Sequence, residues 1–207
     1  YLVSNDSAEI LIYDRKTTKE NSLFFLFSFL CKKKIRYTVF EYEKIIYLQG
    51  ERVCLSGRNG CGKSSILKLL LGEGLVYEGN VHVGSGLKIS YVSQDTSYLK
   101  GDLKELAREY GLEESLFKTL LCKLDLSREQ FEKDVSLYSA GQKKKVLLAK
   151  SLCEQAHLYV WDEPLNYIDV LSRVQIEELL LEYQPTIIFV EHDTAFRKNV
   201  ATKIVDM

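Results

Sequence analysis

Short apolar runs, each bordered by glycine or polar residues, predict buried strands in the second part of the chain. They occupy residues 52–56, 157–161 and 186–190. Apolar residues at helical spacing follow or precede these runs, in residues 64–71, from about residue 142, in 172–182 and after the last strand. Strands that alternate with helices predict an α/β fold with a parallel sheet, whose ligands lie at the carboxyl ends of the strands.

Other stretches have different patterns. Residues 23–30, 38–48 and 81–92 are rich in aromatic and β-branched residues and predict strands and hairpins, which form an antiparallel β-subdomain. Residues 99–133 have helical spacing without a strand signal, so they predict an inserted α-helical subdomain of two or three helices, with limits at about 97–140. Residues 1–21 are polar and weakly patterned, which indicates a linker or lead-in before a domain at 22–207.

Composition narrows the choice of function. The formal net charge is −1, so the chain as a whole has no electrostatic bias toward nucleic acid or anionic membranes. Five cysteines without a C-x-x-C pair argue against a disulfide framework and a structural zinc site, and favour the reducing cytoplasm. The most apolar run, residues 23–31, has about half of the roughly 20 residues that span a bilayer, so we expect no membrane insertion.

A glycine-rich stretch between a predicted strand and a predicted helix fits the phosphate-loop pattern G-x-x-x-x-G-K-[ST]. It consists of Gly57, Arg58, Asn59, Gly60, Cys61, Gly62, Lys63 and Ser64. The glycines let successive N–H groups converge on phosphate oxygens, Lys63 can reach the β- and γ-phosphates, and Ser64 can hold Mg²⁺. The chain is therefore expected to bind a nucleoside triphosphate.

A phosphate loop needs a carboxylate for the metal and a group that handles the attacking water. Asp162 ends a predicted strand and is the expected Mg²⁺ ligand, and Glu163 is the expected general base. Taken alone, the pair is equally consistent with an acidic strand end before a proline. Gln94 and His192 also follow predicted strands, where they can bridge metal and water and donate to a γ-phosphate oxygen.

The order and spacing of several motifs resemble the nucleotide-binding domain of ATP-binding-cassette (ABC) proteins over about residues 22–207. The motifs are GRNGCGKS, the glutamine of YVSQD, YSAGQ, VWDE, PLNYID and the histidine of VEHD. The resemblance implies a P-loop NTPase fold that uses ATP and Mg²⁺. It assigns phosphate and metal binding to Lys63, Ser64 and Ser65, γ-phosphate sensing to Gln94, and the switch histidine to His192.

The same resemblance implies that two cassettes act together. Ser139, Gly141 and Gln142 would bind nucleotide held by the opposite cassette, and Asp169 would close the turn that meets it. The second cassette would come from the same parent chain or from a homodimer. Three lysines, 143–145, follow this motif. We expect them to face solvent or acidic surface rather than to contact the partner's phosphate.

The branch of the family depends on the turn after Glu163. Transporters usually read P-T-S-A-L-D there, whereas PLNYID keeps the asparagine of the soluble ABC-F pattern P-T-N-H-L-D. The chain is most similar to the second cassette of the Lsa and Vga group, whose members bind ribosomes and protect against antibiotics. The alternative is the ATPase subunit of a membrane transporter. A GTPase or small-molecule kinase is a third class, but no N-K-x-D motif occurs.

Some residues depart from the family pattern. Tyr138 and Ala140 replace Leu and Gly of the general signature, and Glu191 stands where Ser or Thr is frequent. The residue that stacks on adenine is Phe29 or Tyr37 by position. The basic run at residues 32–36 is either a contact with ribosomal RNA or a solvated hairpin tip, and the second interpretation is favoured.

Overall fold

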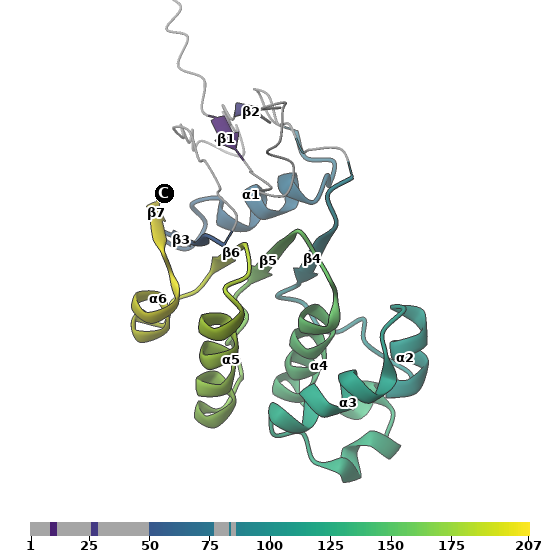
Figure 1. Cartoon of the computed structure of the whole chain (residues 1–207). Coiled ribbons are helices and arrows are strands. Elements are labelled where there is room, and N and C mark those ends of the chain that lie inside the picture. The colour runs from purple at the N-terminus through teal and green to yellow at the C-terminus, as the bar shows by residue number, and fades with distance from the viewer. Residues whose placement is uncertain (1–8, 12–25, 29–49, 77–82, 84–85) are drawn as a thin grey trace, which may run out of the picture.

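The computed structural model describes residues 9–11, 26–28, 50–76, 83 and 86–207 (Figure 1). Its centre is a five-stranded sheet in the order β4-β5-β6-β3-β7, in which all neighbouring strands are parallel. The strands are β3 (Arg52–Ser56), β4 (Ile89–Val92), β5 (Leu158–Asp162), β6 (Ile187–Val190) and β7 (Lys203–Asp206). The predicted α/β fold with a parallel sheet is confirmed.

Helices cover both faces of this sheet (Figure 1). Helix α1 (Lys63–Leu70) lies on one face, and α4 (Ala140–Cys153), α5 (Val170–Tyr183) and α6 (Thr194–Val200) lie on the other. The alternation of side chains along a strand produces two apolar cores. In β3, Val53 and Leu55 pack in the cluster that contains α1, whereas Cys54 packs in the cluster that contains the other helices.

A helical segment separates β4 from α4, as the sequence predicts. It contains α2 (Leu103–Glu109), α3 (Glu114–Lys123) and the 3₁₀ turns η2 (Arg128–Glu132) and η3 (Val135–Leu137). Phe117 and Leu121 of α3 are fully buried in the same core cluster as α4. This apolar contact fixes the segment against the helix that begins with the YSAGQ motif.

Strand β7 is not predicted by the sequence pattern. It follows α6 and pairs with β3 at the edge of the sheet, where three of its four residues are more exposed than a central strand would be. A strand of this kind lacks the continuous apolar run that identifies the central strands. Within the predicted stretch 81–92, Ile89–Val92 is strand, whereas the described residues 83 and 86–88 are not.

The segment predicted as a lead-in contains strand β1 (Glu9–Leu11), which pairs antiparallel with β2 (Leu26–Ser28). Three residues are too few to produce a readable alternation, which explains why the polar composition of 1–21 predicted only a linker. The rest of the predicted strands 23–30 and 38–48 lies outside the described residues. So do Phe29, Tyr37 and the basic run 32–36, and the limits of the domain and of its helical subdomain stay predictions.

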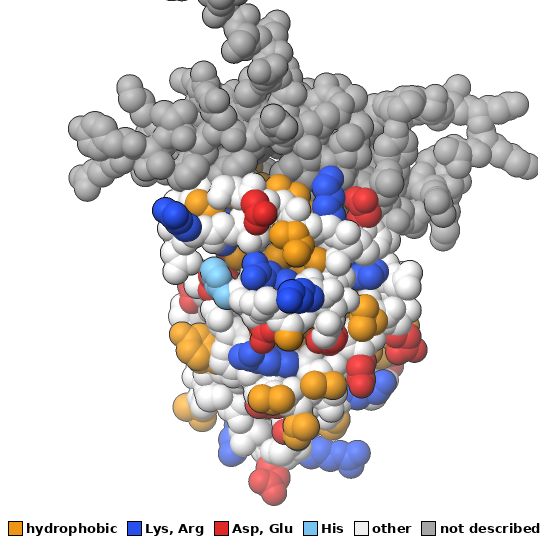
Figure 2. All heavy atoms as spheres, turned by 90° about the vertical axis from the view of Figure 1, so that its left-hand side faces the viewer, with side chains coloured by type: hydrophobic (Ala, Val, Ile, Leu, Met, Phe, Trp, Pro, Cys, Tyr) orange, Lys and Arg blue, Asp and Glu red, His pale blue; other side chains and the backbone are white. Residues whose placement is uncertain are grey.

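Surface and cysteine chemistry agree with the composition. Figure 2 shows basic, acidic and apolar side chains intermixed on one face of the described part of the molecule. The described cysteines Cys54, Cys61, Cys122 and Cys153 form no disulfide with one another. Among the described helices, none combines the length and the apolar character that a bilayer span requires.

Candidate active site

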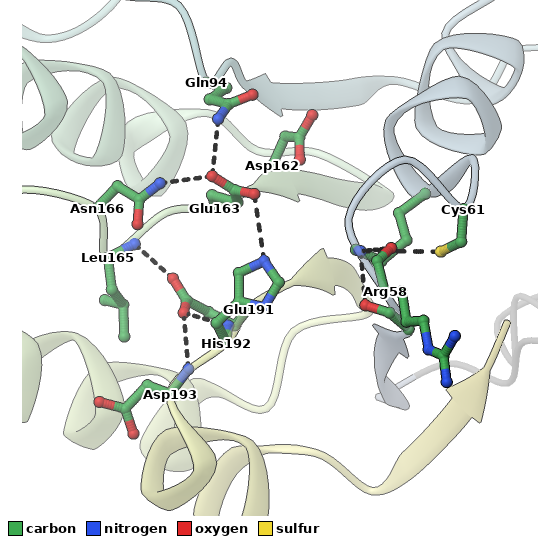
Figure 3. A network of polar contacts seen from close by, with 12 residues as sticks. Arg58, Cys61, Gln94, Asp162, Glu163, Leu165, Asn166, Glu191, His192 and Asp193 are labelled. Carbon is green, nitrogen blue, oxygen red and sulfur yellow. Dashed lines mark hydrogen bonds and ion pairs between the residues drawn. The ribbon is translucent and has the colours of Figure 1, made fainter.

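The carboxyl ends of adjacent parallel strands meet at one edge of the sheet, and the predicted site residues follow them there. The phosphate loop follows β3, Gln94 follows β4, Glu163 follows β5 and His192 follows β6. Figure 3 shows these side chains and the loop around one space. The structure therefore brings together residues that are far apart in sequence.

The glycine-rich loop turns directly into α1. Gly62 has φ 103°, in the left-handed region that favours glycine, and it forms the N-cap of the helix without a side-chain cap. A helix start without a side-chain cap is a typical place for an anion to bind. This backbone geometry is the one that phosphate binding requires.

Lys63 lies within the curve of the loop. Its side chain is buried, and Nζ donates to the carbonyl oxygens of Gly57 at 2.9 Å and Arg58 at 3.0 Å. It also lies 3.8 Å from the sulfur of Cys61. The ammonium group thus lies at the centre of the loop and donates to oxygen acceptors. Phosphate oxygens are acceptors of the same kind.

Asp162 is the metal ligand that the sequence predicts. It is only 3 % exposed, and its Oδ1 has no hydrogen-bond partner among the described residues. Burial raises the pKa of this carboxyl, while a hydrogen bond with the Ser64 side chain acts in the opposite direction. A buried carboxylate oxygen that lacks a donor, beside a hydroxyl at the start of α1, fits a Mg²⁺ ion.

Three side chains surround the carboxylate of Glu163. Gln94 donates to Oε2 at 2.8 Å and Asn166 donates to the same oxygen at 2.5 Å. The His192 Nε2 atom lies 3.4 Å from Oε1. Glu163 itself has φ 48°, a left-handed conformation that is unusual for a residue with a side chain. The expected base is therefore held in a defined position by side chains from three strand ends.

Asn166 is a site residue that the sequence analysis used only as a marker of the family branch. Its signal was the spacing of three residues after Glu163, since the turn brings its amide back onto the Glu163 carboxylate. The amide of Gln94 binds Glu163 through nitrogen, so its proposed contact with a metal would use its oxygen. That metal contact stays a prediction.

The YSAGQ motif begins helix α4. The Ser139 side chain accepts from the Gln142 N–H at 3.2 Å, and the Gln142 side chain accepts from the Ser139 N–H at 2.9 Å. These reciprocal bonds form a capping box. Gly141 approaches the turn after Glu163 so closely that a Cβ atom there would lie 2.4 Å from the Tyr167 carbonyl oxygen. The proposed contacts of these residues with a second nucleotide stay predictions.

The lysines after this motif do not all face outward, and the expectation that they face solvent or acidic surface is wrong for Lys144. Lys144 is 1 % exposed and donates to the carbonyl oxygens of Ser93 at 2.7 Å and Asp162 at 3.3 Å. Burial lowers its pKa to about 8, although the nearby carboxylates of Asp162 and Glu163 oppose the shift. Lys144 therefore links the ends of β4 and β5 beneath the site.

Lys145 faces an acidic side chain, which is one of the two environments that we expect for these lysines. The acidic partner belongs to the same chain. Its Nζ lies 2.7 Å from Asp169 Oδ2 and donates to the Asp125 carbonyl oxygen at 3.3 Å. Asp169 also caps α5 by accepting from the Ser172 N–H at 2.9 Å. Burial works against its ionisation, but the bonds from Lys145 and Ser172 outweigh this and hold its pKa well below the ordinary value.

Comparison with known proteins agrees with this geometry. The family model described as ABC transporter matches residues 46–166. The chain is 32% identical over 166 residues to the ATP-binding protein Uup of Buchnera aphidicola, covering 76% of this chain and 28% of that protein. It is 31% identical over 166 residues to ABC transporter F family member 2 of Arabidopsis thaliana, covering 77% of this chain and 24% of that protein.

Solved structures show the same fold. The RNase-L Inhibitor matches with a TM-score of 0.64 and 26% identity over 76% of this chain and 32% of that one. The archaeal ribosome recycling factor aABCE1, solved in complex with the ribosomal stalk protein aP1, matches with a TM-score of 0.65 and 25% identity. That match covers 77% of this chain and 32% of the recycling factor.

The chain spans about a quarter of the length of these curated relatives. The family model covers the phosphate loop, Asp162, Glu163 and the first residues of the turn that follows. The matched family model covers more than half of the chain. By its sequence and by the geometry of its site, this chain belongs to the ABC transporter family and forms one of its ATP-binding domains.

Proposed function

We propose that this chain binds ATP with Mg²⁺ and hydrolyses it as one cassette of an ABC-F protein. The observation that carries this proposal is the position of Glu163, whose carboxylate is held by Gln94, Asn166 and His192. A general base must be fixed near the γ-phosphate, and this one lies on the same sheet edge as the phosphate loop. The reaction is in-line attack of water on the γ-phosphate.

Each part of the site has a role in this reaction. The N–H groups of residues 57–64 and the ammonium of Lys63 bind the phosphates, and Asp162 with Ser64 holds the metal. When bound, Mg²⁺ neutralises charge that develops on the phosphate oxygens. Glu163 orients the water and accepts its proton, while His192 donates to a γ-phosphate oxygen. Ser65 and Gln94 complete the phosphate and metal contacts.

Hydrolysis is proposed to depend on a second cassette, in the same parent chain or in a second copy. Ser139, Gly141 and Gln142 would bind the nucleotide held by that partner. The surroundings of Asp169 support this arrangement, because the turn before it packs on the start of α4 and apolar side chains are exposed on both sides of it. Tyr167, Val170 and Leu171 are 78%, 73% and 68% exposed, which is unusual for neighbouring apolar residues.

The proposed setting is the ribosome, in the cytoplasm, with a protein of the Lsa and Vga antibiotic-resistance type. Three observations support it. Relatives include a protein named as an F family member, a similar structure is a ribosome recycling factor, and the turn PLNYID keeps the ABC-F asparagine. Contact with ribosomal RNA would come from the parent protein, because the net charge of this chain is −1.

The second candidate is the ATPase domain of a membrane transporter, favoured by the family model itself, which is described as ABC transporter. The two candidates share the chemistry of the site and differ in the partner. A transporter ATPase copurifies with a membrane-spanning subunit, whereas an ABC-F protein cosediments with ribosomes. Sedimentation through sucrose with ATP, using a Glu163→Gln form that retains nucleotide, distinguishes them.

The hydrolysis itself is tested by the same substitution. Glu163→Gln is expected to lower ATP turnover by about 10² or more, the loss typical of a general base, while ATP binding is retained. Glu182→Gln, on an exposed position of α5, is the matched control and should leave turnover unchanged. Wild-type turnover in the Glu163→Gln protein would show that the assigned base is wrong.

A further inference from the structure

Glu191 is a buried carboxylate directly after β6, one residue before His192. It is 5% exposed, and both of its oxygens accept hydrogen bonds from backbone N–H groups. Oε2 accepts from His192 at 2.8 Å and from Asp193 at 3.2 Å. Oε1 accepts from Leu165 at 2.8 Å, in the turn that follows Glu163 (Figure 3). One side chain therefore joins the loops after β5 and β6.

The turn that Glu191 holds has a conformation that requires support. Glu163 and Tyr167 have φ angles of 48° and 65°, and residues other than glycine adopt such values only where the surroundings impose them. Leu165 lies between them, and the next residue, Asn166, donates to the Glu163 carboxylate. The bond from Leu165 to Glu191 consequently fixes the segment that positions the base.

A second side chain holds the same two loops from the other side. Arg173 of α5 donates to the carbonyl oxygens of Ile168 at 2.9 Å and Leu165 at 3.3 Å, and to the Asp193 carboxylate at 3.2 Å. The N–H of Leu165 is thus bound by Glu191 and its carbonyl by Arg173. The turn after Glu163 cannot move relative to the loop that carries His192 without breaking these bonds.

A charged residue at this place has a cost, because burial of a carboxylate is unfavourable unless donors surround it. Serine or threonine, which are frequent here in the family, have a single oxygen on a shorter side chain. Only a longer side chain with two acceptor oxygens reaches His192 and Leu165 together. The cost of burial is therefore offset by a connection that a hydroxyl residue does not provide.

We infer that Glu191 is a positioning residue for ATP hydrolysis, which couples the orientation of Glu163 to that of His192. One oxygen fixes the backbone of His192 and the other fixes the turn that carries Asn166. Glu191 does not contact the reacting atoms and acts only through these residues. The inference rests on the proposed function, because it assumes that Glu163 and His192 act on ATP.

The test compares ATP turnover, ATP affinity and thermal stability of Glu191 variants in the purified protein. Glu191→Gln places an NH₂ group against backbone N–H donors and is expected to lower kcat by about 10- to 100-fold, the loss typical of a misplaced catalytic group. The Kd of a fluorescent ATP analogue should change by less than about threefold, since the phosphate loop is not touched. Glu191→Asp keeps the charge near His192 but is too short for Leu165, so an intermediate kcat is expected.

A matched control separates positioning from general stability. Glu154→Gln removes a carboxylate that is 14% exposed and paired with Lys150 at 3.1 Å, at the far end of α4. It should lower the melting temperature without lowering kcat, measured well below that temperature. If Glu191→Gln fails to fold, Glu191→Thr replaces it in the comparison, with the same expected loss of kcat at retained affinity.

A double variant gives the decisive result. If Glu191 acts through the site, Glu191→Gln should lower kcat by a distinctly smaller factor in a His192→Ala protein than in the wild type. Factors that simply multiply, or wild-type kcat in Glu191→Gln while Glu163→Gln is inactive, would overturn the inference alone. Full activity of Glu163→Gln would instead overturn the proposed function and the inference with it.

Discussion

The lysines of the phosphate loop and those at the start of α4 are held by different kinds of contact. In the loop, Lys63 bonds to the carbonyl oxygens of Gly57 and Arg58, which lie within six residues of it. In the other region, Lys144 bonds to Ser93 and Asp162, and Lys145 pairs with Asp169. The first arrangement is local in the sequence, and the second exists only once distant strands and helices have assembled.

This difference explains why the environment of Lys63 could be predicted from the sequence and the environments of Lys144 and Lys145 could not. A glycine-rich loop between strand and helix determines its own geometry, so the role of Lys63 follows from the motif. Three adjacent lysines at a helix start look solvated, because a helix N-terminus disfavours positive charge. The carbonyl oxygens at the ends of β4 and β5 offset this effect for Lys144, and they are not visible in the local sequence.

The contrast between the phosphate loop and the start of α4 is tested most strongly by a substitution of Lys63. Lys63→Ala removes the cation that faces the phosphates, so we expect ATP affinity to fall by about 100-fold, which corresponds to ~2.7 kcal/mol. The free energy of unfolding should fall less than in a variant of a buried lysine, because Gly57 is half-buried and Arg58 is exposed, so water can replace the lost donor. Titration with a fluorescent ATP analogue and urea unfolding measure the two quantities. Lys68→Ala, on the exposed side of α1, is the control for both.

The fold was predictable to the extent that its elements have a strong local pattern. The central strands carry continuous apolar runs because both of their faces are covered by helices, and the sequence analysis identified them within one or two residues. Strand β7 lies at an edge and, among the described strands, pairs with β3 alone, so its pattern is weak and it was missed. The edge position of β7, and not only its short length, explains why the sequence pattern did not predict it.

Lys144→Met is expected to have the next largest effect, on stability. The methionine fills the same buried space but leaves the carbonyl oxygens of Ser93 and Asp162 without their lysine donor. We expect a loss of about 2 kcal/mol in the free energy of unfolding, which is typical of unsatisfied buried acceptors. Urea unfolding followed by circular dichroism provides the measurement.

The neighbouring lysine is the matched control for this change. Lys143 is only partly buried, and Lys143→Met should change the free energy of unfolding by no more than about 0.5 kcal/mol. Equal losses in the two variants would mean that the buried hydrogen bonds of Lys144 contribute no stability beyond that of a partly buried lysine. The contrast between the phosphate loop and the start of α4 would then lose its physical basis.

The candidate site shows the same division between local and distant information. Gln94, Asp162, Glu163 and His192 were found because each lies at the end of a predicted strand or shortly after it. The positions of Asn166 and Glu191 follow from the left-handed conformation of Glu163 and from the contact between two loops. Neither of these properties has a periodic or compositional signal, so the sequence indicated only that Asn166 matches the ABC-F pattern and that Glu191 departs from the family pattern.

A smaller effect is expected at Gly141, where α4 meets the turn after Glu163. An alanine within a helix usually stabilises it relative to glycine, by up to about 1 kcal/mol. Here the added Cβ would lie 2.4 Å from the Tyr167 carbonyl oxygen, so the turn must shift. We expect Gly141→Ala to lower the free energy of unfolding by about 1 kcal/mol. A gain in stability would show that the turn yields freely at this contact.

The smallest effect concerns the ion pair between Lys145 and Asp169, and it depends on pH. Asp169→Asn keeps a side chain that caps α5 but removes the charge, whereas Asp169→Ala removes both and should cost about 1 kcal/mol more. The pKa of Asp169 is lower in the folded chain than in the unfolded chain. The contribution of Asp169 to stability is therefore fully present above the pKa of the unfolded chain, about 3.9, and is lost as the pH falls toward the pKa of the folded chain.

Urea unfolding between pH 7 and pH 3 should give a constant difference between wild type and Asp169→Asn above about pH 5 and a shrinking difference below pH 4. A difference that stays constant to pH 3 would mean that the ion pair contributes nothing to stability.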